Sequence, residues 1–306
     1  MQRRFLVMAK PFVKWVGGKG QLISEITQRL PEYVKNGLPY IYVEPFSGSA
    51  ALALHLLDSE HPPTAVILND INTDLVNLYN VIKSYPHELL ACLKVIQSEY
   101  DQLEDKEAKQ PYYYAKRDEF NTRKASDIKH AGLFIFLNRA GFNGLYRVNS
   151  KNKFNVPIGS YKKPNFVFED TILKASEVLS KVEVYNQSYE DTLAHLEQSN
   201  KDNLPALFYF DPPYKPLSES SSFTSYSKDS FNDEEQEKLK SFCDLIDKKG
   251  YQWLLSNSDT TNLDAENIFF DTLYSEYKIE RVKASRSINS KGSKRGQINE
   301  LLISNY

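Results

Sequence analysis

The segment Leu207-Phe208-Tyr209-Phe210-Asp211-Pro212-Pro213-Tyr214 is an apolar run that leads directly into Asp-Pro-Pro-Tyr. Its aromatic composition is typical of a buried parallel strand, and the two prolines end such a strand. Open α/β sheets bind ligands just beyond the carboxyl ends of their strands. The segment therefore predicts an α/β sheet with a rigid corner at its ligand-binding edge.

The groups on this corner suit a planar base with an exocyclic amine. The Asp211 carboxylate and the Pro212 carbonyl can each accept an N–H hydrogen bond, and the Tyr214 ring can stack on the base. The alternative is a plain Pro-Pro turn closed by a tyrosine. We take Asp211, Pro212, Pro213 and Tyr214 as the candidate catalytic residues.

A second segment, from Tyr40 to Leu52, has the layout of the first βα unit of a nucleotide-binding fold. An apolar run leads through a turn of small residues into an apolar helix start, although only Gly48 is a glycine and the dinucleotide fingerprint is absent. A further short strand, from Ala65, ends at the acidic Asp70. Such a carboxylate receives ribose hydroxyls in these folds; alternatively, Asp70 caps the helix that begins near Asn72.

The amino-terminal segment contains Lys14-Trp15-Val16-Gly17-Gly18-Lys19. Adjacent glycines allow the backbone to approach a ligand closely, Lys19 can meet a carboxylate, and Trp15 can cover an apolar or aromatic group. The same residues also fit an ordinary loop before a helix. This segment gains weight from its position, because the Gly48 turn, Asp70 and Asp211 follow it in that order along the chain.

Composition limits the possible classes of protein. The chain has 306 residues and is 41% hydrophobic, which is enough for a packed core, and it has no apolar run of membrane-spanning length. Its first residues are too short for a secretory signal. Cys92 and Cys243 are the only cysteines, which fits a reducing cytoplasm, and the five histidines show no ligand spacing, so no metal is expected.

Basic residues are concentrated in two segments although the net charge is −2. From Ile128 to Phe168 there are seven Lys or Arg and no Asp or Glu. From Lys278 to Gln297 there are seven more, against Glu280 alone. Two such blocks on a nearly neutral protein indicate phosphate binding, and the alternative is a pair of solvated surface segments.

Taken together and in this order, these motifs resemble the Dam-type, α-group DNA adenine N6-methyltransferases. The resemblance runs from about Lys10 to Tyr306 and is strongest with the methyltransferases of GATC restriction-modification systems. It is carried further by the following segments: Phe142 to Lys151, Phe154 to Pro157, Pro216 to Ser218, Ser222 to Tyr226, Ser285 to Ile288, and Asn299 to Leu302. One departure is Ser160, where relatives often carry an arginine, which puts one phosphate contact in doubt.

The resemblance implies S-adenosylmethionine as the cofactor. In that family pattern Trp15 and Lys19 cover and pair with the cofactor, Asp70 takes the ribose hydroxyls, and Tyr189 packs beside the cofactor adenine. Glu44, Phe46, Ser47 and Gly48 shape the pocket for its methionine part, and Asp211 is also expected to contact the cofactor.

The resemblance also implies that double-stranded DNA is the partner. Arg147 would read a guanine of GATC, while Leu145 and Pro157 would touch other bases. Phe142 and Asn143 would fill the gap left by a flipped adenine. The other residues expected at the DNA are Lys14, Arg139, Asn155 and Tyr161. Alternatively, Phe142 and Leu145 are core residues and Arg147 contacts a phosphate.

The expected architecture is a Rossmann-like α/β methyltransferase domain with an inserted, mainly helical DNA-recognition domain. Residues 1–80 and 166–306 form the catalytic domain and residues 81–165 the insertion, with helices at Pro86 to Leu103 and Ala131 to Asn138. The alternation of strands and helices implies a mostly parallel sheet, and the last two strands form a hairpin at its edge. The expected strands start near residues 40, 65, 182, 207, 252, 277 and 301.

We expect a monomeric enzyme that uses no metal and no membrane. Two rival functions remain open. One is methylation of an RNA base or a protein glutamine, for which Asn is more common where Asp211 stands. The other is a binding protein of the same fold that has lost catalysis, which the intact Asp211, Lys19 and Asp70 argue against.

Overall fold

The structure is a computed structural model that describes residues 8–214, 231–262, 264–285 and 297–306. The chain forms two compact units, each built from three separate segments. The first unit comprises Met1–Gly18, Gly48–Ser59 and Asp70–Asn186, and the second Lys19–Ser47, Glu60–Asn69 and Gln187–Tyr306. These units are defined by packing alone, so the functional division at residues 81 and 165 stays a prediction.

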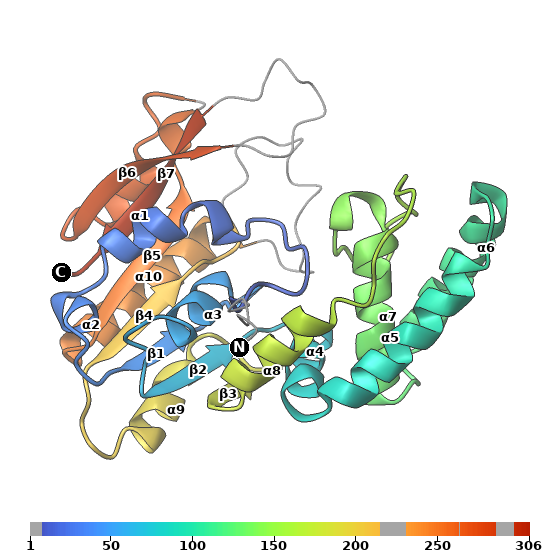
Figure 1. Cartoon of the computed structure of the whole chain (residues 1–306). Helices are drawn as coiled ribbons and strands as arrows, with labels where there is room; N and C mark the ends of the chain where they lie inside the picture. The colour runs from blue at the N-terminus through green and yellow to red at the C-terminus, as the bar shows by residue number, and fades with distance from the viewer. Residues whose placement is uncertain (1–7, 215–230, 263, 286–296) are drawn as a thin grey trace. The chain divides into compact units, whose positions relative to one another are not determined.

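The second unit contains six strands of a seven-stranded sheet (Figure 1). In spatial order they are β2 (Ala65–Asn69), β1 (Ile41–Glu44), β4 (Ala206–Phe210), β5 (Gln252–Ser258), β7 (Gln297–Ser304) and β6 (Lys278–Ser285). The first four run parallel, whereas β7 is antiparallel to both β5 and β6. The predicted parallel sheet with a final hairpin at its edge is therefore confirmed.

Burial explains why these strands could be read from the sequence. Every residue of β1 and β4 is buried, as expected of parallel strands covered on both faces. Their register pairs Val43 with Phe208, so both strands end at the same edge of the sheet. The residues that follow Glu44 and Phe210 therefore leave the sheet at its carboxyl edge.

Among the described residues of the second unit, the α-helices beside this sheet are α1 (Ile23–Gln28), α2 (Glu32–Lys35), α9 (Asp191–Ser199), α10 (Asp233–Lys248) and α11 (Phe269–Leu273). The best defined by sequence is α10, which packs on β5. The Asn232 side chain accepts a hydrogen bond from the Glu235 N–H and caps α10, and three acidic residues in its first turn favour the helix dipole. Its apolar stripe, which includes Leu239 and Ile246, is buried.

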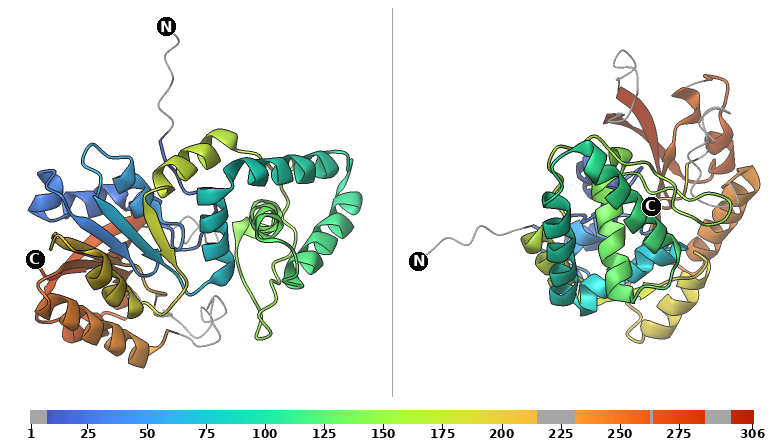
Figure 2. Two further views of the ribbon diagram at one scale, coloured as in Figure 1. Left: turned by 90° about the horizontal axis from the view of Figure 1, so that it is seen from below. Right: turned by 90° about the vertical axis from the view of Figure 1, so that its right-hand side faces the viewer.

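The first unit is mainly helical and contains the seventh strand, β3 (Val182–Tyr185). Its helices are α3 (Ala51–Leu57), α4 (Thr73–Ser84), α5 (Pro86–Asp101), α6 (Lys106–Asn121), α7 (Asp127–Ala140) and α8 (Glu169–Leu179). Helices α4, α5 and α6 all pack on α7, drawn in green (Figure 2). Almost the whole circumference of α7 is buried, as expected of a helix at the centre of a bundle.

The predicted helices at Pro86 to Leu103 and Ala131 to Asn138 are confirmed as α5 and as part of α7. Helix α6 was not predicted. It is strongly polar and contains Pro111, which normally interrupts a helix because it lacks an N–H. The Asp105 side chain accepts a hydrogen bond from the Ala108 N–H and starts the helix, and packing on α7 completes it.

Candidate active site and nucleic-acid interface

The Asp-Pro-Pro-Tyr corner begins where the buried strand β4 ends. Asp211 follows Phe210 directly, and Pro212 is buried while Pro213 is exposed. Neither proline can donate to a neighbouring strand, so the pairing of β4 stops here. Asp211 therefore stands at the carboxyl edge of the sheet, as predicted.

Two side chains hold the Asp211 carboxylate. Lys19 Nζ lies 2.8 Å from Asp211 Oδ1, and the Ser256 hydroxyl donates to the same oxygen at 3.1 Å. The side chain of Lys19 is only 5% exposed and that of Asp211 is 21% exposed, so solvent screens this ion pair weakly. Lys19 thus meets a carboxylate, as the sequence suggested, and that carboxylate belongs to the corner itself.

Tyr214 is fixed at both its ring and its hydroxyl. The hydroxyl donates to Glu300 Oε2 at 2.6 Å, and Lys19 Nζ lies 4.4 Å from the ring centroid. The ammonium of Lys19 therefore contacts both Asp211 and the face of Tyr214. Sequence reasoning assigned no role to Ser256 or Glu300, because both come from other strands.

The surroundings of the corner shift the pKa values of Asp211 and Tyr214. Burial raises the pKa of Asp211 above the ordinary aspartate value, and the nearby Glu300 carboxylate raises it further, while Lys19 and the Ser256 hydrogen bond act in the opposite direction. Burial, together with Asp211 and Glu300, raises the pKa of Tyr214 well above its usual range. Tyr214 therefore stays neutral and can donate to Glu300.

Four further predicted residues lie in the second unit: Glu44 at the end of β1, Phe46 and Ser47 in the turn that follows it, and Tyr189 just before α9. Glu44 is buried and accepts a hydrogen bond from the Tyr42 hydroxyl at 3.0 Å. The rings of Phe46 and Tyr189 lie 5.1 Å apart. The Ser47 hydroxyl is buried without a hydrogen-bond partner among the described residues, which fits a site that receives a polar ligand atom.

In the first unit, Asp70 closes the turn that precedes α3. Its two carboxylate oxygens accept hydrogen bonds from the Gly48 and Asn72 N–H groups, each at 2.9 Å. Gly48 and Ala50 both have positive φ, so this turn is held in a conformation that non-glycine residues rarely adopt. Burial raises the pKa of Asp70 although these two hydrogen bonds oppose the shift.

The alternative reading of Asp70 as a helix cap is wrong. Asn72 is the N-cap of α4, since its side chain accepts a hydrogen bond from the Leu75 N–H at 3.1 Å. The Asp70 carboxylate therefore joins the Gly48 turn to the backbone N–H of Asn72, while the Asn72 side chain caps α4.

Trp15 contacts this turn on one side and Tyr146 on the other. A Cβ atom on Gly48 would lie 3.0 Å from Trp15 Cδ1 and Nε1, so only glycine fits without a shift of the indole. The Trp15 ring stacks on Tyr146 with centroids 5.6 Å apart. Trp15 and Gly48 are thus brought together as predicted cofactor residues should be.

Residues 142–161 form an irregular segment after α7, which we call the reading segment. The buried Asn138 side chain ties it to the amino-terminal segment by bonding to both backbone groups of Lys14 and to the Gly144 carbonyl. Asn143 and Gly144 have positive φ, and a side chain on Gly144 would clash with Lys14. The start of the segment is therefore shaped to fit against Lys14.

The side chains expected at DNA differ in exposure. Phe142, Asn143, Pro157 and Tyr161 are exposed, and Leu145 is half-buried. Phe142 is 49% exposed, so the alternative that it is an ordinary core residue is wrong. The hydroxyl of Tyr161 lies 3.2 Å from Lys14 Nζ.

Arg147 is held by Asn155, which lies further along the reading segment. Its Nε donates to Asn155 Oδ1 at 2.7 Å, and the Asn155 N–H donates back to the Arg147 carbonyl at 3.1 Å. Arg139 is more enclosed: it lies over the Phe168 ring at 4.2 Å, and its Nη2 donates to the Phe12 carbonyl. Burial lowers the pKa of Arg139.

A buried polar network that sequence reasoning missed supports the reading segment. Asp74 on α4 accepts hydrogen bonds from the Tyr146 hydroxyl at 2.6 Å and from Arg123 Nη1 at 2.7 Å, and His130 Nε2 lies 2.8 Å away. Its side chain is 8% exposed. Because Tyr146 lies between Leu145 and Arg147, this network fixes the base of the segment that was expected to read DNA.

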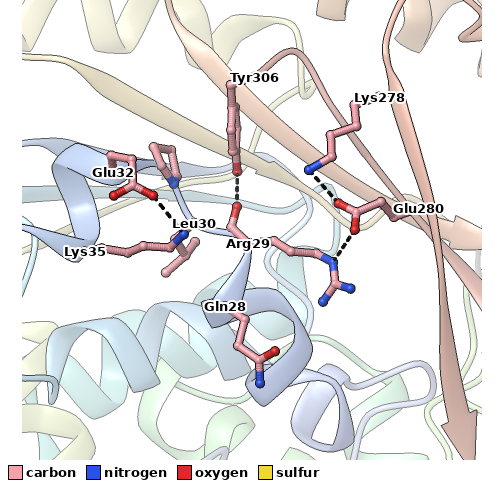
Figure 3. A pocket seen from close by; sticks show the side chains of 9 residues that line it. Gln28, Arg29, Leu30, Glu32, Lys35, Lys278, Glu280 and Tyr306 are labelled. Carbon is pink, nitrogen blue, oxygen red and sulfur yellow. Dashed lines mark hydrogen bonds and ion pairs between the residues drawn. The ribbon is translucent and has the colours of Figure 1, made fainter.

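One cavity lies apart from the predicted catalytic, cofactor and DNA residues. It has a volume of about 490 Å³ in the second unit (Figure 3). Arg29 and Lys278 both pair with Glu280 there, and the Tyr306 hydroxyl donates to the Arg29 carbonyl. Of its lining residues only Lys278 belongs to a predicted binding feature, the second basic block, and the charged side chains of the cavity are paired with one another.

Several predicted features lie outside the described residues. These are Pro216 to Ser218, Ser222 to Tyr226, Arg286 to Ile288 and most of the second basic block. Within the described residues, no cluster of His, Cys, Asp and Glu could hold a metal ion. No helix in the described parts of the chain is long and apolar enough to cross a membrane.

Comparison with known proteins gives a consistent result. The profile of a family described as D12 class N6 adenine-specific DNA methyltransferase matches residues 15–288. The Type II methyltransferase M.MjaIII of Methanocaldococcus jannaschii is 42% identical over 97% of this chain and 99% of its own. The Type II methyltransferase M1.LlaDCHI of Lactococcus lactis is 36% identical (97% and 95%), and the DNA adenine methylase of Escherichia coli K12 is 34% identical (96% and 94%).

Proposed function

Because the chain belongs to the D12 class of N6 adenine-specific DNA methyltransferases, we propose that it methylates N6 of an adenine flipped out of double-stranded GATC, with S-adenosylmethionine as methyl donor. Membership of this class makes the protein an adenine-specific DNA methyltransferase. The finer statements on target sequence, base flipping and cofactor are our proposal. They are supported by the resemblance of the reading segment to the GATC methyltransferases and by the geometry of the corner after β4.

The observation that carries the proposal is the cluster at Asp211. The Lys19 ion pair and the Ser256 hydrogen bond hold the carboxylate in one orientation. The Pro212 carbonyl faces no competing N–H from either proline, and Tyr214 is anchored through Glu300. A rigid corner with two acceptors and an aromatic face is what N6 of a flipped adenine requires.

In the proposed reaction Asp211 and the Pro212 carbonyl accept hydrogen bonds from the N6 amine, which directs its lone pair away from the ring. Tyr214 stacks on the base and excludes water from one face. When bound, S-adenosylmethionine supplies an activated methyl group, which bonds to N6 while the carbon–sulfur electron pair stays on sulfur. The Asp211 carboxylate can take the proton that the methylated nitrogen releases and pass it to water. Orientation and electrostatics supply the acceleration, and no covalent enzyme intermediate is needed.

The proposed cofactor contacts follow the residues of the family pattern. Asp70 would accept the ribose hydroxyls, Trp15 and Tyr189 would cover the flat groups, and Glu44 and residues 46–48 would shape the methionine pocket. Lys19 would pair with the cofactor as well as with Asp211. The buried, unpartnered Ser47 hydroxyl and the strained Gly48 turn support a ligand at these positions.

Direct assay of methyl transfer tests the proposal. The purified protein and radiolabelled S-adenosylmethionine are incubated separately with duplex DNA, with transfer or ribosomal RNA, and with a release-factor peptide. We expect label only in duplex DNA, at N6 of adenine. Plasmid from a methylation-deficient host that expresses the protein should resist nucleases blocked by GATC methylation. Label in RNA or peptide instead would support the rival function, and sensitive plasmid would overturn the GATC target.

Cofactor binding is expected to depend on Asp70. Asp70→Ala removes a charge-assisted contact of roughly 1.5–3 kcal/mol, so we predict at least about tenfold weaker binding of S-adenosylmethionine. Asp70→Asn keeps an acceptor for one backbone N–H, so its affinity for S-adenosylmethionine should lie between those of the parent and Asp70→Ala. Isothermal titration calorimetry measures both.

The matched control for this prediction is Asn72→Ala. It removes the cap of α4 but keeps the backbone N–H that donates to Asp70. It should lower stability by about 1 kcal/mol and leave cofactor affinity unchanged. Equal affinity of the parent and Asp70→Ala would exclude Asp70 from the cofactor site.

Recognition of the target sequence is expected to depend on Arg147. If its guanidinium reads a guanine, Arg147→Ala should lose about 1–3 kcal/mol of discrimination at one base pair of the site. Arg147→Lys keeps the charge but loses the planar fork, so it should lose the same discrimination. Methylation rates on GATC and on duplexes with single substitutions give the answer. If Arg147 contacts a phosphate instead, Arg147→Ala should weaken binding to all duplexes alike, and Arg147→Lys should restore that binding.

A further inference from the structure

Glu300 reaches the corner because of the register of the last strand. Strand β7 runs antiparallel to β5 and pairs Glu300 with Ser258. Strand β5 in turn pairs Leu255 with Phe210, the last residue of β4, and continues beyond it. Glu300 is therefore carried to the same edge of the sheet as Asp211, within the second unit.

The contact that Glu300 makes there is with the residue expected to stack on the target base. Its Oε2 accepts the Tyr214 hydroxyl at 2.6 Å, a distance typical of a strong hydrogen bond to a charged acceptor. Tyr214 follows two prolines and lies beyond the end of β4, so no strand pairing fixes its side chain. The bond to Glu300 holds the far end of the ring, and Lys19 contacts its face at 4.4 Å.

Glu300 also acts on the corner through its charge. The groups that face Asp211 are Lys19 from the segment before α1, Glu300 from β7, the Tyr209 hydroxyl from β4, and Tyr214. Glu44 of β1 acts on Tyr209. Lys19 pairs with Asp211, and the Glu300 carboxylate adds a second negative charge that acts on Asp211, which leaves excess negative charge at the corner. A methyl transfer that carries a positive charge from sulfur to nitrogen is favoured by such surroundings.

We propose that Glu300 is a positioning residue for methyl transfer, which fixes the plane of the Tyr214 ring and contributes negative charge beside Asp211. This inference rests on the proposed function, in which Tyr214 stacks on adenine and Asp211 holds N6. It adds to that function a residue with two separable effects, one exerted through a hydrogen bond and the other through charge.

Two variants, Glu300→Gln and Tyr214→Phe, test these two effects. Glu300→Gln keeps the shape and an acceptor oxygen but loses the charge, and Tyr214→Phe loses only the hydroxyl. Each should lower kcat about tenfold, the loss expected for one charge-assisted hydrogen bond, with little change in KM for S-adenosylmethionine. Because both variants act on the same Tyr214–Glu300 bond, their effects on kcat should combine less than additively in the double variant.

The pH dependence separates the charge from the hydrogen bond. Activity requires the ionised Asp211, so kcat falls as pH is lowered through the raised pKa of this carboxyl. The Glu300 carboxylate raises that pKa, and its removal should move the acid limb of the profile to lower pH. Tyr214→Phe keeps the carboxylate and should not produce the shift that Glu300→Gln produces.

The experiment is a steady-state analysis of the full chain on duplex GATC DNA from acid to neutral pH. Glu280→Gln is the matched control, because Glu280 lies on β6 and pairs with Arg29 and Lys278; it should leave kcat and the profile unchanged. An unaltered kcat and acid limb in Glu300→Gln, with an active parent and an inactive Asp211→Ala, would overturn the proposal. An inactive parent would instead overturn the proposed function.

Discussion

Asp211→Ala is expected to abolish methyl transfer while DNA binding and most of the cofactor binding remain. The carboxylate interacts with N6 most strongly as that nitrogen becomes tetrahedral and cationic, so its loss affects kcat more than ground-state affinity. Removal of one pre-oriented electrostatic group typically costs a factor of 10²–10³, and we predict a loss of about a hundredfold or more. Single-turnover methylation of duplex DNA measures it.

Two comparisons make this prediction specific. Asp211→Asn keeps the shape and one acceptor oxygen but not the charge, and should retain low activity. Ser256→Ala removes only one of the hydrogen bonds that orient the carboxylate and should cost less than either Asp211 variant. If Asp211→Ala kept a rate within about tenfold of the parent, roughly 1.4 kcal/mol of barrier, the corner after β4 would not be the catalytic centre.

Of the substitutions proposed for this protein, Asp74→Ala is expected to cause the largest loss of stability. It leaves the Tyr146 hydroxyl, the Arg123 guanidinium and the His130 ring without their shared partner in a buried setting. Breaking a buried charged network from one side typically costs about 3–5 kcal/mol. We therefore predict a fall of at least about 3 kcal/mol in the free energy of unfolding, measured by urea titration with circular dichroism.

The pH dependence of stability gives an independent check on Asp74. Burial alone would raise its pKa, but hydrogen bonds from His130 and Tyr146 and the charge of Arg123 lower it below the ordinary aspartate value. A carboxyl with a lowered folded pKa stabilises the protein above its unfolded pKa, and this contribution disappears as pH falls through the folded pKa. Asp74→Asn should lack that acid-dependent component. If Asp74→Ala were as stable as the parent at neutral pH, the network around Asp74 would not contribute to the free energy of unfolding.

Most strands could be predicted because their sequences carry a simple signal. Strands β1 and β4 are buried along their whole length and read as continuous apolar runs. Helix α6 gave no such signal, since its polar sequence becomes helical through contact with α7. Local sequence also could not distinguish the roles of Asp70 and Asn72, which lie two residues apart and can both accept hydrogen bonds from backbone N–H groups.

The candidate site could be predicted only where it is local in sequence. Asp211 to Tyr214 form one tetrapeptide whose chemistry can be read directly. Ser256 and Glu300 act on it through strand register, and register depends on how β4, β5 and β7 pair rather than on any one segment. Asp74 was missed for the same reason, because its partners come from other helices and from the reading segment.

The position of β7 has a consequence for when the enzyme becomes active during its synthesis. This strand is synthesised after the other strands of the sheet, yet it lies between β5 and β6 and carries Glu300 to the corner. Until β7 has left the ribosome, β5 has an unpaired edge and β6 has no neighbour in the sheet. A nascent chain that already contains the tetrapeptide Asp211 to Tyr214 would therefore lack an ordered corner. Premature termination before β7 should yield an inactive, aggregation-prone fragment rather than a partly active enzyme.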